Sequence, residues 1–297
     1  MKPVFAAVLL ALALTGPLGA QDSDAEVTFP LASQLGQIDN GLTPAMADEA
    51  LKDSVRAMSF ILFHEVAHML IHELDLPVLG WEEDAADTLA VYLLVRDPDP
   101  NNVPLLSAAI HLFANTQTPF DQLSVENFFS EHSMNLQRAY NAVCIMVGHD
   151  PLRFTDLADT LGIPEDQRRK CMFRAERALD SWAAVLKPHK RSAGDPSGAE
   201  LLWDYQRPET QWQRDLGHVY RQTRILERMG ASIHDTFALP RQIQFVAANC
   251  GKPNAFYMPD RAAVVICWEK LEQVFALFAN EEIRQADAAA PKDEKDN

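Results

Sequence analysis

Basic residues are scarce in this sequence: 26 Lys and Arg stand against 42 Asp and Glu, a formal net charge of −16. A chain this acidic is repelled by phosphate backbones and by anionic lipid surfaces, so nucleic acids and membranes are disfavoured as partners. Beyond the N-terminus we expect no stable membrane insertion. No internal repeat is visible, and the 47% hydrophobic content is that of an ordinary globular enzyme.

Cysteine is also scarce, with four residues in the whole chain. None of them stands in a C-x-x-C pair, so a zinc site built from cysteines is disfavoured. None lies near the N-terminus, so a lipoprotein anchor is not expected either.

The N-terminus has the pattern of an export signal. Lys2 precedes an apolar stretch from Val4 to Leu14, and small residues follow up to Ala20. The stretch is too short and wrongly flanked for a stable membrane span, although an uncleaved anchor is the alternative. We expect residues 1–20 to be a signal peptide, which leaves 277 residues (297 − 20) in a periplasmic or secreted protein.

Export makes disulfides the expected state of the four cysteines, because the compartment outside the cytoplasm is oxidising. Four cysteines allow three connectivities. We favour the sequence-local pairs, Cys144 with Cys171 and Cys250 with Cys267.

Residues 64–68, His-Glu-Val-Ala-His, have the pattern H-E-x-x-H inside an apolar segment that predicts a buried helix. Because His64 and His68 are four residues apart, they lie on one face of that helix and can bind one metal ion. Glu65 lies one step round the helix, where it can act on a water molecule as the catalytic base. The alternative is a helix whose His and Glu side chains merely face a polar cavity.

A hydrolytic zinc site needs three protein ligands and one open position. Glu83 begins a second apolar helical stretch, and Asp87 shares its face one turn later, where it can hydrogen-bond a ligand histidine. The turn at residues 76–80 contains Pro and Gly and can bring Glu83 back to the two histidines. We expect one Zn²⁺ per chain, and we expect the neighbouring Glu82 to be dispensable because it points about a hundred degrees away.

This combination of H-E-x-x-H with Glu83-Asp84-Ala85-Ala86-Asp87 resembles the gluzincin group of metallopeptidases. The residues from His64 to Ile71 and from Leu76 to Asp87 more closely resemble a family of secreted bacterial metallopeptidase-like proteins catalogued as a domain of unknown function. That resemblance covers most of the mature chain. It implies zinc bound by His64, His68 and Glu83, a histidine oriented by Asp87, and a peptide or protein substrate.

Near the C-terminus, Asn254-Ala255-Phe256-Tyr257 resembles the edge strand with which neprilysin-like enzymes hydrogen-bond the substrate backbone. The resemblance implies that Asn254 and Ala255 bind substrate. In those enzymes the strand precedes the H-E-x-x-H helix, whereas here it follows. The chain is therefore either circularly permuted relative to that arrangement, or the segment is an ordinary hairpin.

The remaining histidines are less informative. His72 continues the stripe of His64 and His68, but it is too far along the helix to bind the same ion, so we expect a surface residue. Five others are candidates for stabilising the transition state, and the sequence does not choose among them: His111, His132, His149, His218 and His234.

The predicted architecture is an α+β, mostly helical, zincin-like fold with a small β-sheet, in a single domain over residues 21–284. A helical zinc-site part covers about 45–187, a linker about 188–200, and a hairpin-containing part about 201–284, followed by a disordered tail over 285–297. Helices are predicted from about residue 45 to residue 71, and over residues 83–94, 105–115, 121–146, 165–187 and 269–280. Strands are predicted over residues 243–247, 255–258 and 263–268.

The predicted function is endopeptidase-type hydrolysis of peptide bonds by a zinc-activated water, with Glu65 moving the proton. Two alternatives belong to other classes. One is a non-catalytic envelope binding or chaperone-like protein on a zincin scaffold, and the other is a zinc amidase that acts on cell-wall material. A closed structural zinc site would need a fourth protein ligand, and none stands at helical spacing from the other three.

Overall fold

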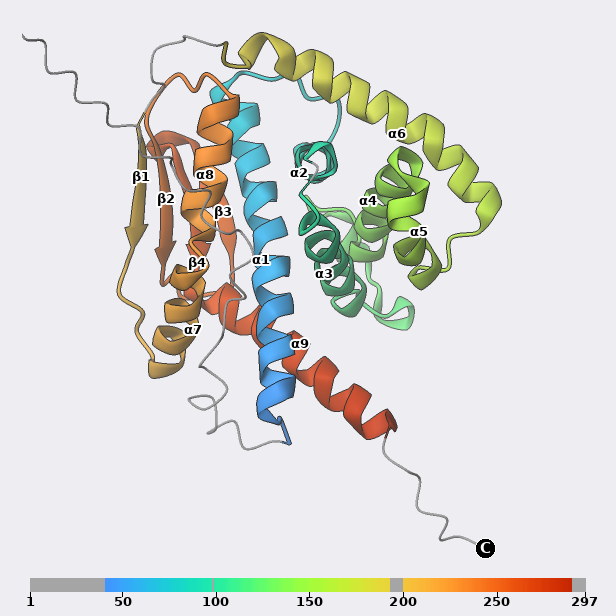
Figure 1. Cartoon of the computed structure of the whole chain (residues 1–297), viewed down its shortest axis with the longest axis vertical. Helices are drawn as coiled ribbons and strands as arrows, with labels where there is room; N and C mark the ends of the chain where they lie inside the picture. The colour runs from blue at the N-terminus through green and yellow to red at the C-terminus, as the bar shows by residue number, and fades with distance from the viewer. Residues whose placement is uncertain (1–40, 98, 193–199, 290–297) are drawn as a thin grey trace, which may run out of the picture.

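The computed structural model describes residues 41–97, 99–192 and 200–289 (Figure 1). Its helices are α1 (Pro44–Glu73), α2 (Glu82–Arg96), α3 (Asn102–Asn115), α4 (Asn135–His149), α5 (Pro151–Thr160), α6 (Glu165–Leu186), α7 (Gln211–Gln222), α8 (Ile225–Thr236) and α9 (Trp268–Ala289). Its strands are β1 (Leu201–Tyr205), β2 (Ile243–Ala248), β3 (Ala255–Met258) and β4 (Ala263–Cys267). The mostly helical α+β prediction is confirmed. The predicted signal peptide, residues 1–20, lies outside the described residues.

Helix α1 is the central element, with the sheet on one side and helices α2 to α6 on the other (Figure 1). It is one unbroken helix of 30 residues. Thr43 caps its start by accepting a hydrogen bond from the Met46 N–H at 3.3 Å, and Pro44 fills the first position. By length and composition α1 could cross a membrane, yet 72% of its most apolar window is buried inside the protein, as expected for a core helix.

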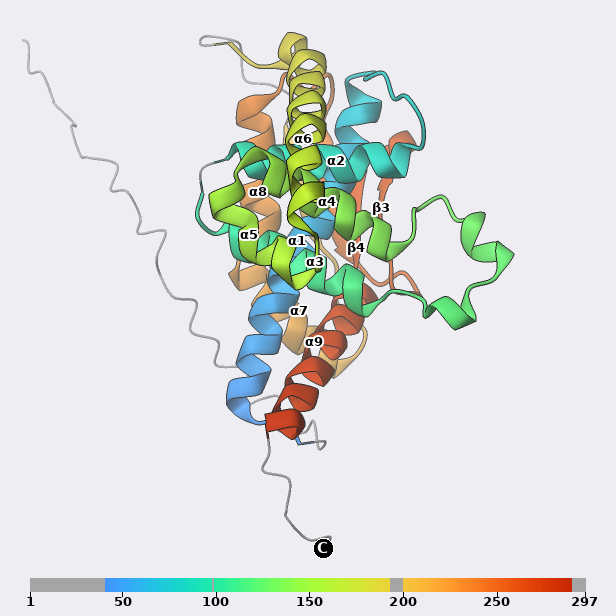
Figure 2. The same ribbon diagram turned by 90° about the vertical axis from the view of Figure 1, so that its right-hand side faces the viewer.

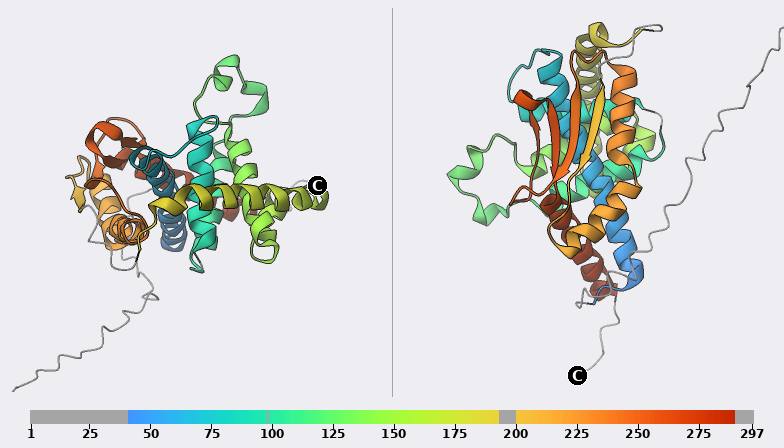
Figure 3. Two further views of the ribbon diagram at one scale, coloured as in Figure 1. Left: turned by 90° about the horizontal axis from the view of Figure 1, so that it is seen from above. Right: turned by 90° about the vertical axis from the view of Figure 1, so that its left-hand side faces the viewer.

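The sheet has the strand order β1-β2-β4-β3, with β1, β2 and β4 parallel and β3 antiparallel to β4 (Figure 3, right). Strand β3 is therefore an edge strand. It packs against α1, as does β4, while α8 packs against β1. The predicted strands near residues 243, 255 and 263 are all present, and β1 is an additional strand that the sequence did not indicate.

Helices α4 and α6 make the closest helix pair in the helical half, and a Cys144–Cys171 disulfide joins them. Gly148 makes this approach possible, because a Cβ at that position would lie 2.2 Å from the Cys171 carbonyl oxygen. The second disulfide, Cys250–Cys267, ties the loop before β3 to the end of β4. These are the two sequence-local pairs.

Residues 117–134 differ from the helix that the sequence suggests over 121–146. They form a lobe that projects from the body, with two short 3₁₀ turns at Phe120–Gln122 and Val125–Phe128 (Figure 2). The aromatic residues of this lobe are exposed, between 63% and 73% for Phe120, Phe128 and Phe129. Without a core to pack against, their spacing confers no helical stability. The regular helix begins only at Asn135.

The C-terminal helix is longer than predicted. The sequence predicts that this helix ends at Asn280 and that residues 285–297 form a disordered tail, but α9 continues through Ala289. Buried residues Phe275 and Phe278 pack in the part of α9 that was predicted, and the helix continues beyond them through residues that are half-buried or exposed. The rest of that tail, and residues 193–199 of the predicted linker, lie outside the described residues.

Candidate metal centre

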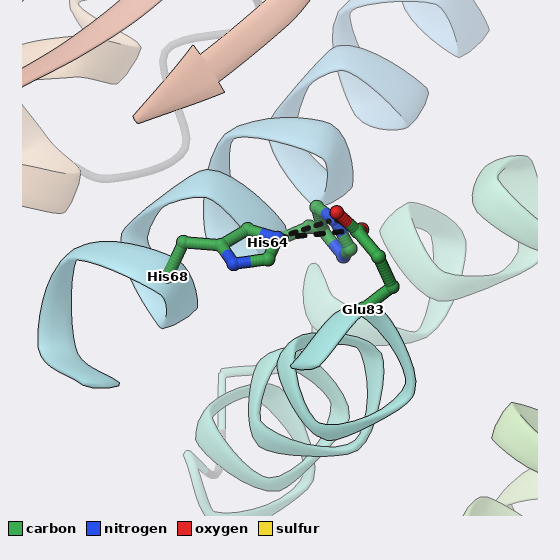
Figure 4. A group of neighbouring side chains, drawn as sticks. All are labelled: His64, His68 and Glu83. Carbon is green, nitrogen blue, oxygen red and sulfur yellow. Dashed lines mark hydrogen bonds and ion pairs between the residues drawn. The ribbon is translucent and has the colours of Figure 1, made fainter. Parts of the chain in front are cut away.

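Three side chains from two helices converge beside the C-terminal part of α1. His64 and His68 project from α1, and Glu83 reaches them from the first turn of α2 (Figure 4). Glu83 Oε2 lies 3.0 Å from His64 Nε2 and 3.3 Å from His68 Nε2, and the two Nε2 atoms are 3.2 Å apart. The three donors predicted from spacing are thus brought to one point.

This triangle has the dimensions of one face of a zinc coordination tetrahedron. With ligand bonds of about 2.0–2.1 Å, a tetrahedral site separates neighbouring donors by about 3.3–3.4 Å. The observed separations of 3.0 to 3.3 Å are close to that value. Two imidazole nitrogens and one carboxylate oxygen are also a ligand set that catalytic zinc uses, with the fourth position left for water or substrate. The residues therefore fit a zinc ion.

A second carboxylate orients each histidine. Asp87 Oδ1 lies 2.8 Å from His64 Nδ1, and Glu82 Oε1 lies 2.7 Å from His68 Nδ1. When each Nδ1–H donates to its carboxylate, each Nε2 presents its lone pair to the shared point. The contact with Glu82 was not anticipated, because helix geometry alone directs that residue away from the ion. The Glu82 side chain is nevertheless long enough to reach His68 Nδ1.

The charges of the cluster favour a positive charge among its carboxylates. Burial alone would lower the pKa of His64, but hydrogen bonds to Asp87 and Glu83 outweigh it and raise the pKa to about 10. Burial would raise the pKa of Glu83, yet the surrounding histidines hold it far below its usual range. The first shift arises because carboxylates lie at both ring nitrogens of His64, and the second because histidines surround Glu83. A metal cation held by Glu83 and the two Nε2 atoms would stabilise the Glu83 carboxylate in the same way.

Glu65 is 6% exposed and lines the same cavity as the three donors. Burial raises its pKa, and the adjacent charges of His64 and His68 offset this only in part. A carboxyl group with a raised pKa exchanges protons more readily near neutral pH. Glu65 is thus placed beside the cluster without belonging to it.

The cavity has a volume of about 770 Å³ and is lined by α1, α2, the end of α3, residues 131–138, β3 and α9. His132, from the projecting lobe, is the one of the five undecided histidines that lines it among the described residues. Its Nε2 lies 2.8 Å from Glu83 Oε2, and its ring stacks 5.9 Å from that of His64. His72 also lines the cavity, where its Nε2 lies 3.2 Å from Glu82 Oε1.

Asn254 and Ala255 reach the cavity at the start of edge strand β3. The Cys267 N–H donates to the Asn254 carbonyl at 3.0 Å, so residue 254 faces the neighbouring strand β4. Because antiparallel pairing alternates along a strand, the N–H and C=O of Ala255 point to the free edge. That edge lies beside the cavity of the three donor side chains, and its unpaired backbone groups can pair with an extended peptide.

A second group of potential ligands, Cys250, Cys267 and Glu269, is not a comparable centre. Both sulfurs are in the disulfide. The Glu269 carboxylate accepts hydrogen bonds from the backbone N–H groups of Cys250 and Gly251 at 2.8 to 3.1 Å, so its oxygens already have partners.

Comparison with protein families gives one finding. A family model with the description "Putative metallopeptidase" matches residues 24–186 and 205–296, which include all the side chains of the candidate centre. Among curated proteins and among solved structures nothing matches the chain.

Proposed function

Since the chain belongs to this metallopeptidase family, we propose that it hydrolyses peptide bonds with one zinc ion held by His64, His68 and Glu83. The observation that carries the proposal is the triangle of donor atoms with edges of 3.0 to 3.3 Å, beside a buried carboxyl group and inside a large cavity. Family membership supports a metal-dependent peptidase in general, and the donor set supports zinc.

Bound zinc supplies a Lewis acid that polarises the scissile carbonyl and makes a water acidic. Glu65 takes the proton from the attacking water, and it later returns that proton to the leaving amine. Its raised pKa suits both transfers, because the group is a carboxylate when it accepts and a carboxylic acid when it donates. Asp87 and Glu82 keep His64 and His68 in the tautomer that binds metal.

His132 is placed to stabilise the negative charge that develops on the carbonyl oxygen of the scissile peptide bond during hydrolysis. It lies at the mouth of the cavity with its side chain 45% exposed, in contact with Glu83 but outside the compact cluster of three donors. An imidazolium or N–H donor there stabilises a negative charge that appears only in the transition state. The projecting lobe would thus supply a hydrogen-bond donor to the same cavity as the three ligands.

The substrate lies along β3 in this account. The free edge of the strand accepts an extended peptide as an additional strand, with Ala255 pairing to its backbone and the Asn254 amide as an anchor. This arrangement favours endopeptidase-type cleavage, in which the chain continues on both sides of the scissile bond.

Export of the protein is part of the same proposal. Two disulfides within the described residues suit an oxidising compartment outside the cytoplasm. One hydrophobic core contains residues from the helical part, such as Leu62, and from the C-terminal part, such as Phe245, which supports a single domain. The organisation then follows as signal peptide, one catalytic domain and tail.

The test is peptide cleavage by the purified mature protein and by its Glu65→Gln variant. Removal of one titratable carboxyl group leaves the three ligands in place, so the variant is expected to retain zinc and to lose hydrolysis by about two or more orders of magnitude. Equal rates for the two proteins, or no cleavage of any peptide by zinc-loaded wild type, would contradict the proposal.

A further inference from the structure

One cation in the cavity is not used by the proposed mechanism. Lys270 lies in the first turn of α9 and lines the cavity together with Glu65 and His64. Its Nζ donates to the neutral Gln273 Oε1 at 3.0 Å. Among the described residues, no carboxylate lies within ion-pair distance of this ammonium group. The other cationic side chain of the cavity wall, Arg138, differs because both oxygens of Asp87 already bind it.

The position of Lys270 is unfavourable for a positive charge. Burial lowers its pKa, the Arg138 guanidinium lowers it further, and only Glu65 acts in the opposite direction. The first turn of a helix also disfavours a cation, since the unpaired N–H groups there carry partial positive charge. A lysine at such a position, with no carboxylate within ion-pair distance among the described residues, is suited to bind an anion.

The connectivity places Lys270 at one end of the cavity. It follows β4 by three residues, and the last residue of β4, Cys267, pairs with Asn254 at the start of β3. The other end of β3 is marked by Tyr257, whose ring lies 5.9 Å from that of His72. A peptide laid along β3 therefore has one end toward Lys270 and the other toward His72.

Apolar side chains also line the cavity. Phe60 and Phe113 meet edge to face with ring centroids 5.7 Å apart, and Leu277 of α9 completes the wall. An apolar side chain of the substrate is suited to that wall, with a negative charge nearby at Lys270. The carboxylates of the cavity wall, which disfavour a substrate carboxylate away from this lysine, are Glu65, Glu82, Glu83 and Glu131.

We propose that Lys270 binds a carboxylate of the peptide substrate at the Asn254 end of the cavity, next to an apolar residue. This inference rests on the proposed function and specifies its substrate class. The carboxylate has two possible sources with the same chemistry: the C-terminus of the peptide, which makes the enzyme cleave close to chain ends, or an acidic side chain, which makes it select acidic sequences.

Binding to the zinc-loaded Glu65→Gln protein, measured by calorimetry, tests the proposal without depending on turnover. Three probes separate the sources: acetyl-Phe-Leu with a free carboxylate, acetyl-Phe-Leu-amide with none, and acetyl-Phe-Glu-amide with a side-chain carboxylate. At least one carboxylate probe is expected to bind about tenfold or more tightly than the plain amide, as expected for a hydrogen bond to a charged group. The tighter of the two carboxylate probes identifies the source.

Adding Lys270→Met is expected to abolish the preference, while Lys270→Arg retains most of it because the charge remains. The matched control, Lys252→Met, removes an exposed lysine and is expected to leave the preference intact. Zinc content and thermal unfolding of each variant show whether it is folded and loaded.

A carboxylate preference that survives Lys270→Met would overturn the assignment and point to direct binding by the metal. Equal binding of all three probes, or none, would overturn it as well. Failure of the proposed function looks different: Lys270-dependent binding would persist, but wild type would cleave no peptide.

Discussion

Arg138 holds Asp87 through two parallel hydrogen bonds, from Nε to Oδ2 at 2.7 Å and from Nη2 to Oδ1 at 2.8 Å. Asp87 Oδ1 also contacts His64 Nδ1. A chain of contacts thus runs from α4 through α2 to the candidate metal ligand on α1. Burial would raise the pKa of Asp87, but Arg138 and His64 hold it well below its usual range. The carboxylate stays charged and keeps His64 in one tautomer.

Replacing Arg138 with Met is expected to reduce both stability and zinc affinity. Both side chains of the pair are 12% exposed, so the substitution leaves a buried carboxylate without its partner, at a cost of about 3 kcal/mol in the free energy of unfolding. His64 then loses part of its orientation, and the zinc dissociation constant is expected to rise about tenfold. Chemical denaturation and competition with a metal chelator measure the two effects. Arg177→Met, at an exposed site on α6, is the control, and identical behaviour of the two variants would contradict the role of Arg138.

Glu82→Ala is expected to weaken zinc binding by about tenfold, because Glu82 orients His68 as Asp87 orients His64. The Glu82 side chain is 37% exposed, so water replaces part of the lost contact and the protein should remain as stable as wild type. Asp84→Ala removes the same charge from the same helical turn, and it separates orientation from simple electrostatics. If the two variants bind zinc equally well, the contact between Glu82 and His68 has no function.

Edge strand β3 is fixed to α1 by Glu73, which accepts hydrogen bonds from Tyr257 and from two nitrogens of Arg241, at 2.6 and 2.7 Å for the latter. The bond from Arg241 holds the pKa of Glu73 below its ordinary value of 4.5. Because the folded pKa is depressed, this carboxylate contributes stability above about pH 4.5, and the contribution is lost as pH falls through the folded pKa.

Glu73→Gln is therefore expected to destabilise the protein at pH 7 and to bring its stability closer to that of wild type at acidic pH. The measurement is the free energy of unfolding of both proteins between pH 3 and pH 7, with a chelator present so that zinc does not contribute. Glu49→Gln, which removes an exposed pair with Lys52, should follow wild type throughout. A stability difference between Glu73→Gln and wild type that stays constant with pH would contradict this role of Glu73.

The parts of the centre that local geometry determines could be read from the sequence. His64 and His68 share a face because a helix repeats every 3.6 residues, and Glu83 and Asp87 follow the same rule on the next helix. The turn between the helices is short, so it leaves few ways to place one pair relative to the other.

The features of the centre that depend on packing between distant segments could not be predicted from the sequence. His132 and Arg138 lie 49 and 51 residues after Glu83 and Asp87 (132 − 83 and 138 − 87), and nothing local links them. Lys270 comes to the cavity only because α9 packs on α1. Strand β1 was missed for a similar reason, since its five residues pair in parallel with β2, some 42 positions later.

In the projecting lobe, the sequence predicts a helix that the structure does not contain. Its aromatic residues have a spacing that suggests a buried helical face, yet Phe120, Phe128 and Phe129 are exposed. Periodicity predicts a helix only where a core exists to receive the apolar stripe.

The most direct measurement is the zinc content of the purified mature protein and of its Glu83→Ala variant, prepared side by side without chelator. We expect close to one zinc per chain in wild type and background levels in the variant, because two imidazoles alone leave the triangle of donors incomplete. Zinc at the wild-type level in Glu83→Ala, or none in wild type, would contradict the centre of His64, His68 and Glu83.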